Sequence, residues 1–169
     1  RPSLVALVLA ALLLTISLGA LADTTYTISI SKDSTDKAAH TYGAFQLFKG
    51  DLEEKTESGT TTKTLSNIEW GDDIDTSKIS ALRTALNAID GITVADDADA
   101  KAVAKAISGA NEATAKKIAI AFEAALNSTT THTVTVAVDA TTAAQISGLA
   151  AGYYLVKDTD DVTGEGAQT

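Results

Sequence analysis

The period of the hydrophobic residues changes twice along this chain, and these two changes limit the folds that it can adopt. Residues 26–31 (Tyr-Thr-Ile-Ser-Ile-Ser) alternate with period two, and a β-favouring run follows at Thr41–Phe48. Such alternation puts the apolar side chains on one face of a strand. The period becomes helical after Thr76 and returns to two at Thr131. The order is therefore strands, then helices, then strands.

The first group of strands is interrupted by a polar stretch. Gly50–Thr64 is charged and Thr-rich, which indicates a surface loop. Leu65–Trp70 then resumes a short strand that ends at Gly71.

Three helices are expected in the middle of the chain. The first has candidate caps at Thr76 and Ser77 and a stop at Gly91, and its apolar residues recur at helical spacing: Ile79, Leu82, Leu86 and Ile89. The second runs over Asp99–Ser108. The third begins near Asn111, and one of its faces carries Ile118, Phe122, Ala125 and Leu126. Together these helices make a compact helical block.

Strand signals return in the last third of the chain. Valines alternate with polar or smaller residues in Thr131–Val138, and Tyr153–Lys157 is a second strong strand after Gly152. Ala143–Leu149 lies between them as a short stretch without an assignment. Neither group of strands has enough edges to close a core alone, so we expect one β-sandwich that carries the helices as an insertion. The predicted class is mainly β with an α insertion.

The N-terminal segment has the layout of a secretion signal. Arg1 precedes Pro2–Ala22, which contains no charged residue and has its apolar centre at Leu4–Leu18. The small-residue triplet Ala20-Leu21-Ala22 follows, and such a triplet is typical of a cleavage site.

We therefore expect cleavage between Ala22 and Asp23. Removing 22 of the 169 residues leaves 147, a usual length for one domain, Asp23–Thr169, and changes the formal net charge from −9 to −10. The alternative is an uncleaved membrane anchor, because about 20 apolar residues can span a bilayer. In that case contact with a membrane would be made only by this segment.

Composition excludes several function classes. The net negative charge argues against nucleic acid and anionic membranes as partners. The chain has no cysteine, so an extracellular domain must hold together without disulfides. His40 and His132 are its two histidines and neither lies in a catalytic motif, so we expect no enzymatic activity.

Acidic groups in three places could offer oxygen ligands to Ca²⁺: Asp72, Asp73 and Asp75; Asp96, Asp97 and Asp99; and Asp158, Asp160, Asp161 and Glu165. None has the spacing of a twelve-residue calcium loop, and helix N-termini or solvated loops explain them more simply. We expect no metal and no cofactor. Aromatic residues at Tyr42, Trp70, Tyr153 and Tyr154 could mark a ligand groove, although core or cross-strand packing is expected of them.

Three strings occur in a fixed order around the helical block. They are Y-x-x-F-Q-L-F-x-G-D-L at residues 42–52, L-S-N-I-E-W-G at residues 65–71 and G-Y-Y-L-V-K-D at residues 152–158. Together they resemble the N-terminal domain of the major, backbone subunit of sortase-assembled pili in Gram-positive bacteria. The resemblance covers nearly the whole chain after Ala22, and it implies an Ig-like (CnaB-related) β-sandwich.

The resemblance also implies a function. The chain would be a secreted subunit of the pilus shaft at the cell wall, joined covalently by a sortase to other pilin subunits. The accepting lysine and the sorting signal of that family are not visible in residues 1–169, so the chain is expected to be part of a longer pilin. A surface adhesin or ligand-binding module is the alternative, in which Gly50–Thr64 or the helical block binds host surface molecules. A calcium-dependent domain is a third.

Related domains often form an internal isopeptide bond from a lysine to an asparagine or aspartate. Its chemistry needs a buried, neutral amine beside a protonated carboxyl. The resemblance places the candidate lysine at Lys32, at the end of the first strand. Related domains carry a catalytic glutamate where this chain has Lys157, with Asp158 on the opposite face, and this difference argues against the bond. The alternative is that Lys32 and Lys157 are ordinary surface lysines.

Overall fold

A computed structural model describes residues 25–31, 38–137 and 142–160 of the chain. Its contacts divide the chain into two units. Unit 1 holds the described residues up to Phe45, those of Thr130–Ala150 and those from Leu155 onward. Unit 2 holds Gln46–Thr129 and Ala151–Tyr154. The fold is mainly β, with two sheets and three helices.

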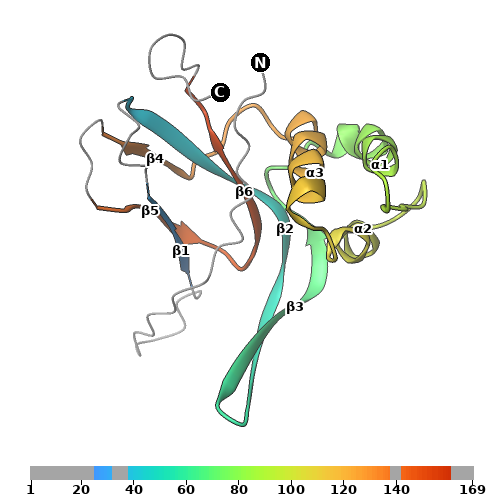
Figure 1. The fold of residues 1–169 in the computed structure, drawn as a ribbon, viewed down its shortest axis with the longest axis horizontal. Coiled ribbons are helices and arrows are strands. Elements are labelled where there is room, and N and C mark those ends of the chain that lie inside the picture. The colour runs from blue at the N-terminus through green and yellow to red at the C-terminus, as the bar shows by residue number, and fades with distance from the viewer. Residues whose placement is uncertain (1–24, 32–37, 138–141, 161–169) are drawn as a thin grey trace. The chain divides into compact units, whose positions relative to one another are not determined.

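Unit 1 contains strands of both sheets (Figure 1). β1 (Tyr26–Ile30) pairs antiparallel with β5 (Ala144–Leu149) in a two-stranded sheet. In the other sheet the start of β2 (His40–Glu57) pairs with β4 (Thr133–Val136), and β6 (Gly152–Asp158) also pairs with β2. The alternation predicted for the first strand is confirmed, because its three apolar residues are buried and the residues between them are not.

Unit 2 contains the long continuation of β2, which pairs antiparallel with β3 (Thr60–Trp70). The prediction of a surface loop at Gly50–Thr64 is therefore wrong. Ser58 and Gly59 have φ values of 51° and 80°, which is the backbone of a two-residue type I′ turn. This turn matches the twist of the strands, and the β-branched threonines favour extended backbone, so charged and Thr-rich flanks form a hairpin.

The three predicted helices are confirmed in unit 2 as α1 (Ile79–Asn87), α2 (Ala100–Ile107) and α3 (Glu112–Ala124). A 3-10 turn, η1 (Thr76–Lys78), precedes α1. The cap predicted for this helix at Thr76 or Ser77 is wrong, because α1 begins after Lys78, which makes no side-chain capping bond, and the capping side chain is that of Asp75 before the 3-10 turn. Its carboxylate accepts hydrogen bonds from both the backbone N–H and the hydroxyl of Ser77, at 3.1 Å and 2.6 Å. A carboxylate is the stronger acceptor at the positive end of a helix.

The core of unit 2 lies between the helices and the strands. α1 packs against α3, and α2 packs against β3 (Figure 1). The least exposed large side chains in this core are Phe48, Leu82, Leu86, Val103 and Phe122. Arg83 secures the loop before α2, because its guanidinium donates hydrogen bonds of 2.6–2.9 Å to the carbonyls of Asp96 and Ala98.

The C-terminal strands are confirmed in part. The strand predicted at Tyr153–Lys157 lies within β6, while β4 is shorter than the predicted Thr131–Val138, whose last residue lies outside the described residues. β5 was not predicted. It has buried residues only at Ile146 and Leu149, since Gly148 at φ 77° breaks the alternation, and pairing with β1 holds it extended.

Among the described helices, none has the length and apolar content needed to cross a membrane. The predicted signal segment and its cleavage site between Ala22 and Asp23 lie outside the described residues.

Candidate functional site

A buried glutamine lies in the middle of the apolar run of β2. Gln46 follows Ala44 and Phe45 and precedes Leu47 and Phe48, and its exposed fraction is only 5%. A buried amide must satisfy its hydrogen-bonding groups inside the protein, because leaving one unpaired costs about 1–3 kcal/mol. Its partners therefore show which segments are held together here.

The partners of Gln46 come from two other segments of unit 2. Its side-chain NH₂ donates to the hydroxyl of Tyr154 at 3.1 Å and to the carbonyl of Ala151 at 3.3 Å. Its side-chain oxygen accepts from the backbone N–H of Asp72 at 3.3 Å, and its own backbone N–H donates to Asp73 Oδ2 at 2.7 Å. Gln46 thus joins β2 to the turn after β3 and to the start of β6.

Two glycines let the three segments approach closely. A Cβ atom on Gly71 would lie 2.0 Å from the carbonyl oxygen of Gln46, and one on Gly152 would lie 2.3 Å from that of Phe48. Any side chain at either position would force backbone apart. The N–H of Gly71 also donates to the carbonyl of Leu47 at 2.9 Å.

Aromatic rings pack beside this polar group. Phe48 is stacked on Trp70, with ring centroids 5.5 Å apart, and meets Tyr153 edge-on at 6.4 Å and Phe122 at 5.6 Å. The cross-strand packing expected of Trp70 and Tyr153 is confirmed. We use the name Gln46 cluster for the residues joined in this way: Gln46, Leu47, Phe48, Trp70, Gly71, Asp72, Asp73, Ala151, Gly152, Tyr153 and Tyr154.

A lysine and a carboxylate meet at the edge of the cluster. Lys49 Nζ lies 2.7 Å from Asp72 Oδ1, and the two side chains are 41% and 78% exposed. The hydrogen bond to Asp72 and the charge of that carboxylate raise the pKa of Lys49 above its usual value. The amine therefore stays protonated and solvated, which is the opposite of what amide-bond formation requires. The pair is a surface salt bridge.

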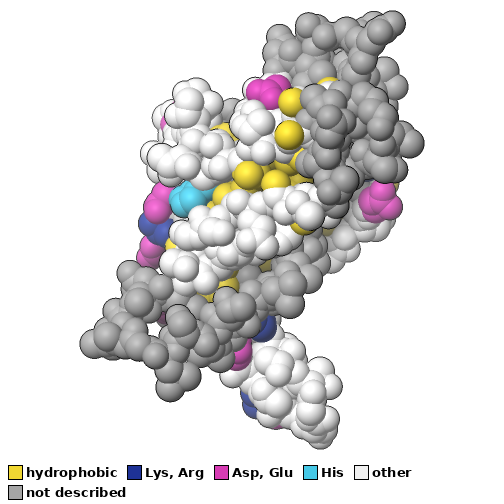
Figure 2. Space-filling view, turned by 90° about the vertical axis from the view of Figure 1, so that its left-hand side faces the viewer, with side chains coloured by type: hydrophobic (Ala, Val, Ile, Leu, Met, Phe, Trp, Pro, Cys, Tyr) yellow, Lys and Arg dark blue, Asp and Glu magenta, His cyan; other side chains and the backbone are white. Residues whose placement is uncertain are grey.

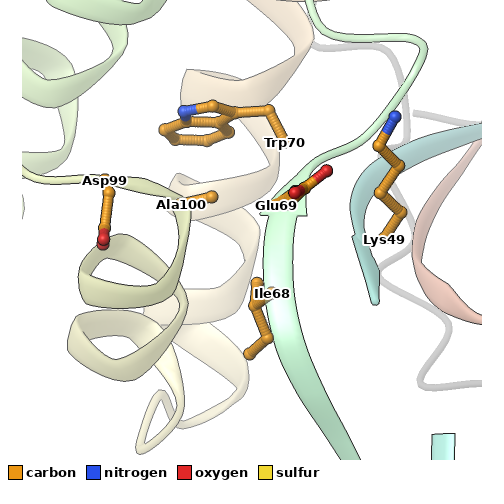
Figure 3. Close-up of a pocket in the computed structure, with 6 residues that line it drawn as sticks. All are labelled: Lys49, Ile68, Glu69, Trp70, Asp99 and Ala100. Carbon is orange, nitrogen blue, oxygen red and sulfur yellow. The ribbon is translucent and has the colours of Figure 1, made fainter. Parts of the chain in front are cut away.

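An open hollow of about 460 Å³ lies beside Trp70. Figure 3 shows the indole extending from the end of β3 toward Ala100 at the start of α2, while Glu69 points the other way, toward Lys49. Asp99 also lines the hollow, and its carboxylate caps α2 by accepting from the N–H of Ala102 at 2.8 Å. These polar groups do not converge on one point, so the hollow does not have the geometry of a ligand site.

Of the two lysines considered for an internal bond, Lys157 lies among the described residues. Lys32 lies outside the described residues. Lys157 lies on β6, and the next residue, Asp158, accepts from His40 Nδ1 at 2.5 Å. His40 is only 4% exposed. In unit 1 this pair ties the end of β6 to the start of β2.

The acidic groups have separate structural partners. Asp73 accepts from the backbone of Gln46, Asp75 caps the 3-10 turn and Asp99 caps α2. Asp160 accepts from the N–H of Thr41 at 2.6 Å. Nowhere in residues 25–31, 38–137 and 142–160 are three or more His, Cys, Asp or Glu side chains grouped so that they could hold a metal ion. Asp161 and Glu165 lie outside these ranges.

Sequence reasoning did not single out Gln46, and it named Asp73 only as a possible calcium ligand. The available signal was a lone amide inside an apolar strand, which is unusual because burial of an unpaired amide is costly. Its partners are 27 and 108 residues away in sequence, so no local pattern could name them.

Comparison of the chain with protein-family models, with curated proteins and with solved structures found no match.

Proposed function

We propose that this chain is the N-terminal domain of a structural subunit of a cell-surface pilus, with a mechanical and not a catalytic role. In this proposal it is secreted by means of Arg1–Ala22 and becomes part of a shaft that a sortase polymerises covalently. Its partners are other pilin subunits and the sortase.

One observation supports the proposal above the others. The three strings that resemble backbone pilins lie far apart in sequence, and residues of all three meet in the Gln46 cluster. The first string supplies Gln46 and Phe48, the second supplies Trp70 and Gly71, and the third supplies Tyr154, with Gly152 against Phe48. The three strings therefore contact one another in the folded chain. Two proteins that pack these segments in the same way would need the same residues at these positions, which is a physical reason for the resemblance.

The fold is compatible with a load-bearing role. Unit 1 contains strands of both sheets, and each sheet contributes buried apolar side chains there, such as Ile28 and Ile146 from one and Val136 and Leu155 from the other. We take these sheets as the Ig-like sandwich that the resemblance implies. With no cysteine in the chain, stability depends on packing and on hydrogen bonds such as those of Gln46.

The proposal is tested in the cells that produce the protein. Cell-wall extracts are boiled in denaturing detergent and probed with an antibody raised against residues 25–160. A ladder of covalent multimers is expected, and it should collapse to a single band when the pilus sortase gene is deleted. A single monomeric band from cells with an intact sortase would refute the proposal.

A further inference from the structure

The β2–β3 hairpin continues beyond the core of unit 2 as a bare ribbon. We call its residues Asp51–Glu57 and Thr60–Ser66 the arm. Every residue from Glu53 to Thr62 is exposed, on both faces of the ribbon. The arm lies at the lower end of Figure 2, and the face seen there carries polar and charged side chains without a hydrophobic patch. The outer part of the arm, from Glu53 to Thr62, therefore adds nothing to the core of its own chain.

Both long edges of the arm are unpaired within the described part of the chain, because there β3 pairs only with β2 and the other partners of β2 lie before Asp51. In a hairpin closed by a two-residue turn, Glu57 and Thr60 exchange the first hydrogen bonds, and bonded pairs then alternate with non-bonded ones. The N–H and C=O groups of Thr61 and Lys63 consequently point outward from β3.

The two edges differ in charge. The β2 edge carries Asp51, Glu53, Glu54 and Glu57 against the single Lys55. The β3 edge carries threonine at 60, 61, 62 and 64, and its one charge, Lys63, is neutralised by Glu54 at 2.8 Å. Threonine favours strands, this edge has no proline, and its one lysine is held by Glu54 of its own hairpin. The irregularity in the β2–β3 pairing lies between Lys49 and Asp51, at the base of the arm, so the strand from Thr60 to Leu65 is regular.

A two-stranded ribbon is marginally stable alone, and an unprotected edge is a template for another strand. We propose that the β3 edge of the arm pairs antiparallel with the β3 edge of a second copy of this chain, and forms a four-stranded ribbon across a two-fold axis. This inference does not depend on the proposed function.

Packing and charge together select this arrangement. Parallel pairing would put both helical blocks at the same end with strands only about 4.8 Å apart, but one helix is already about 10 Å wide. Antiparallel pairing sends the two blocks to opposite ends. Pairing through the β2 edges would bring like charges together, which is unfavourable.

The charge of Lys63 excludes one register, and we take the axis at the neighbouring Thr62. A two-fold axis at Lys63 would place its ammonium opposite that of the second copy. An axis at Thr62 instead pairs Thr62 with itself, Thr61 with Lys63 and Thr60 with Thr64, so no like charges face each other. In such a non-bonded pair the two Thr62 Cα atoms would be about 4.5 Å apart, which is within the range of a disulfide.

Cysteine cross-linking tests the pairing cleanly, because the chain has no cysteine of its own. Thr62→Cys is expected to give a disulfide-linked dimer under mild oxidation. The matched control is Thr64→Cys, on the same exposed strand, whose two copies would be about 13 Å apart and so beyond the reach of a disulfide. We expect at least tenfold faster dimer formation for Thr62→Cys. Equal rates for the two variants would refute the proposed register.

Sedimentation equilibrium of the unmodified chain, up to about 1 mM, tests association itself. The ribbon buries less surface than a standard interface, so a weak, concentration-dependent dimer is expected. Thr61→Pro removes an outward N–H without breaking a backbone bond inside the hairpin and should weaken dimerisation at least tenfold. Thr61→Val should not, although it loses the same hydroxyl bond to Thr56 that the proline variant loses. Circular dichroism checks that both variants fold. A monomer at every concentration would overturn the proposal.

Discussion

Replacing Gly71 by alanine tests whether close backbone approach holds the Gln46 cluster together. The added Cβ atom would lie 2.0 Å from the carbonyl oxygen of Gln46, 2.4 Å from its carbon and 2.9 Å from the carbonyl carbon of Leu47. Ordinary contact begins at about 3.4 Å, and all three obstacles are backbone atoms. The turn after β3 must therefore move away from β2 by roughly 1 Å or more.

The cost follows from the hydrogen bonds that such a movement breaks. They join Gly71 to Leu47 at 2.9 Å, Asp72 to the Gln46 side chain at 3.3 Å, and the Gln46 backbone to the Asp73 carboxylate at 2.7 Å. A neutral hydrogen bond contributes about 1 kcal/mol and one to a charged group about 1.5–3 kcal/mol. We expect Gly71→Ala to lower the free energy of unfolding by about 3–5 kcal/mol.

Urea unfolding followed by tryptophan fluorescence measures this loss. Trp70 is the single tryptophan of the chain and precedes Gly71, so the signal comes from unit 2. With a slope of about 1.5 kcal/mol/M, the midpoint should fall by about 2–3 M. Gly109→Ala is the matched control, because its Cβ would meet nothing within 4 Å. A change below about 0.5 kcal/mol for Gly71→Ala would refute the steric reasoning.

Three further predictions concern packing, capping and pH. Phe122 is fully buried against Phe48, so Phe122→Ala should lower the free energy of unfolding by about 3–5 kcal/mol. Ile120 lies on the same helix and is 55% exposed, so Ile120→Ala should lower it by less than about 1 kcal/mol. Similar losses for the two variants would contradict the assignment of the core. Asp99→Ala should lower the free energy of unfolding by about 1 kcal/mol, because it removes the cap of α2. Asp99→Asn should lower it by only a few tenths of a kcal/mol, since asparagine also caps helices. An equal loss of stability in the two variants would argue against the cap. Hydrogen bonds from the Ser77 side chain and backbone lower the pKa of Asp75 in the folded protein below its ordinary value of 3.8. The ionised carboxylate therefore stabilises the folded state above pH 3.8, and this stabilisation is lost as the pH falls through the pKa of the folded protein. The stability difference between the wild type and Asp75→Asn should therefore shrink between pH 5 and pH 2, and a constant difference would exclude this linkage.

The helices could be predicted closely because their signals are local. Asp99 and Asn111 cap helices within three residues of themselves, and the apolar spacing of Leu82 and Leu86 marks the buried face of α1 within one turn. The donor and the acceptor of such a capping hydrogen bond are only a few residues apart, so a short window of sequence contains both. The same holds for β1, whose alternation alone identified its buried face.

The arm and β5 could not be predicted in this way. The residues on either side of Ser58 and Gly59 are charged and Thr-rich, and such a composition is equally compatible with a loop. They form strands because β2 and β3 pair with each other, through nine residue pairs from Phe48 with Trp70 to Glu57 with Thr60. β5 is extended because β1, more than 100 residues earlier, offers it an edge. Strand pairing is a contact between distant segments, so its partners are absent from any local pattern.

By itself the sequence determined that helices lie between two groups of strands, where the second and third helices begin, and the absence of disulfides, because these depend on neighbouring residues or on composition. Only the tertiary structure decided that Gln46, Gly71 and Tyr154 meet, and that Gly50–Thr64 forms part of a ribbon with open edges. The reason is physical. Burial of an amide and close approach of two backbones are properties of segments brought together by folding, and their energies depend on partners that no single segment contains.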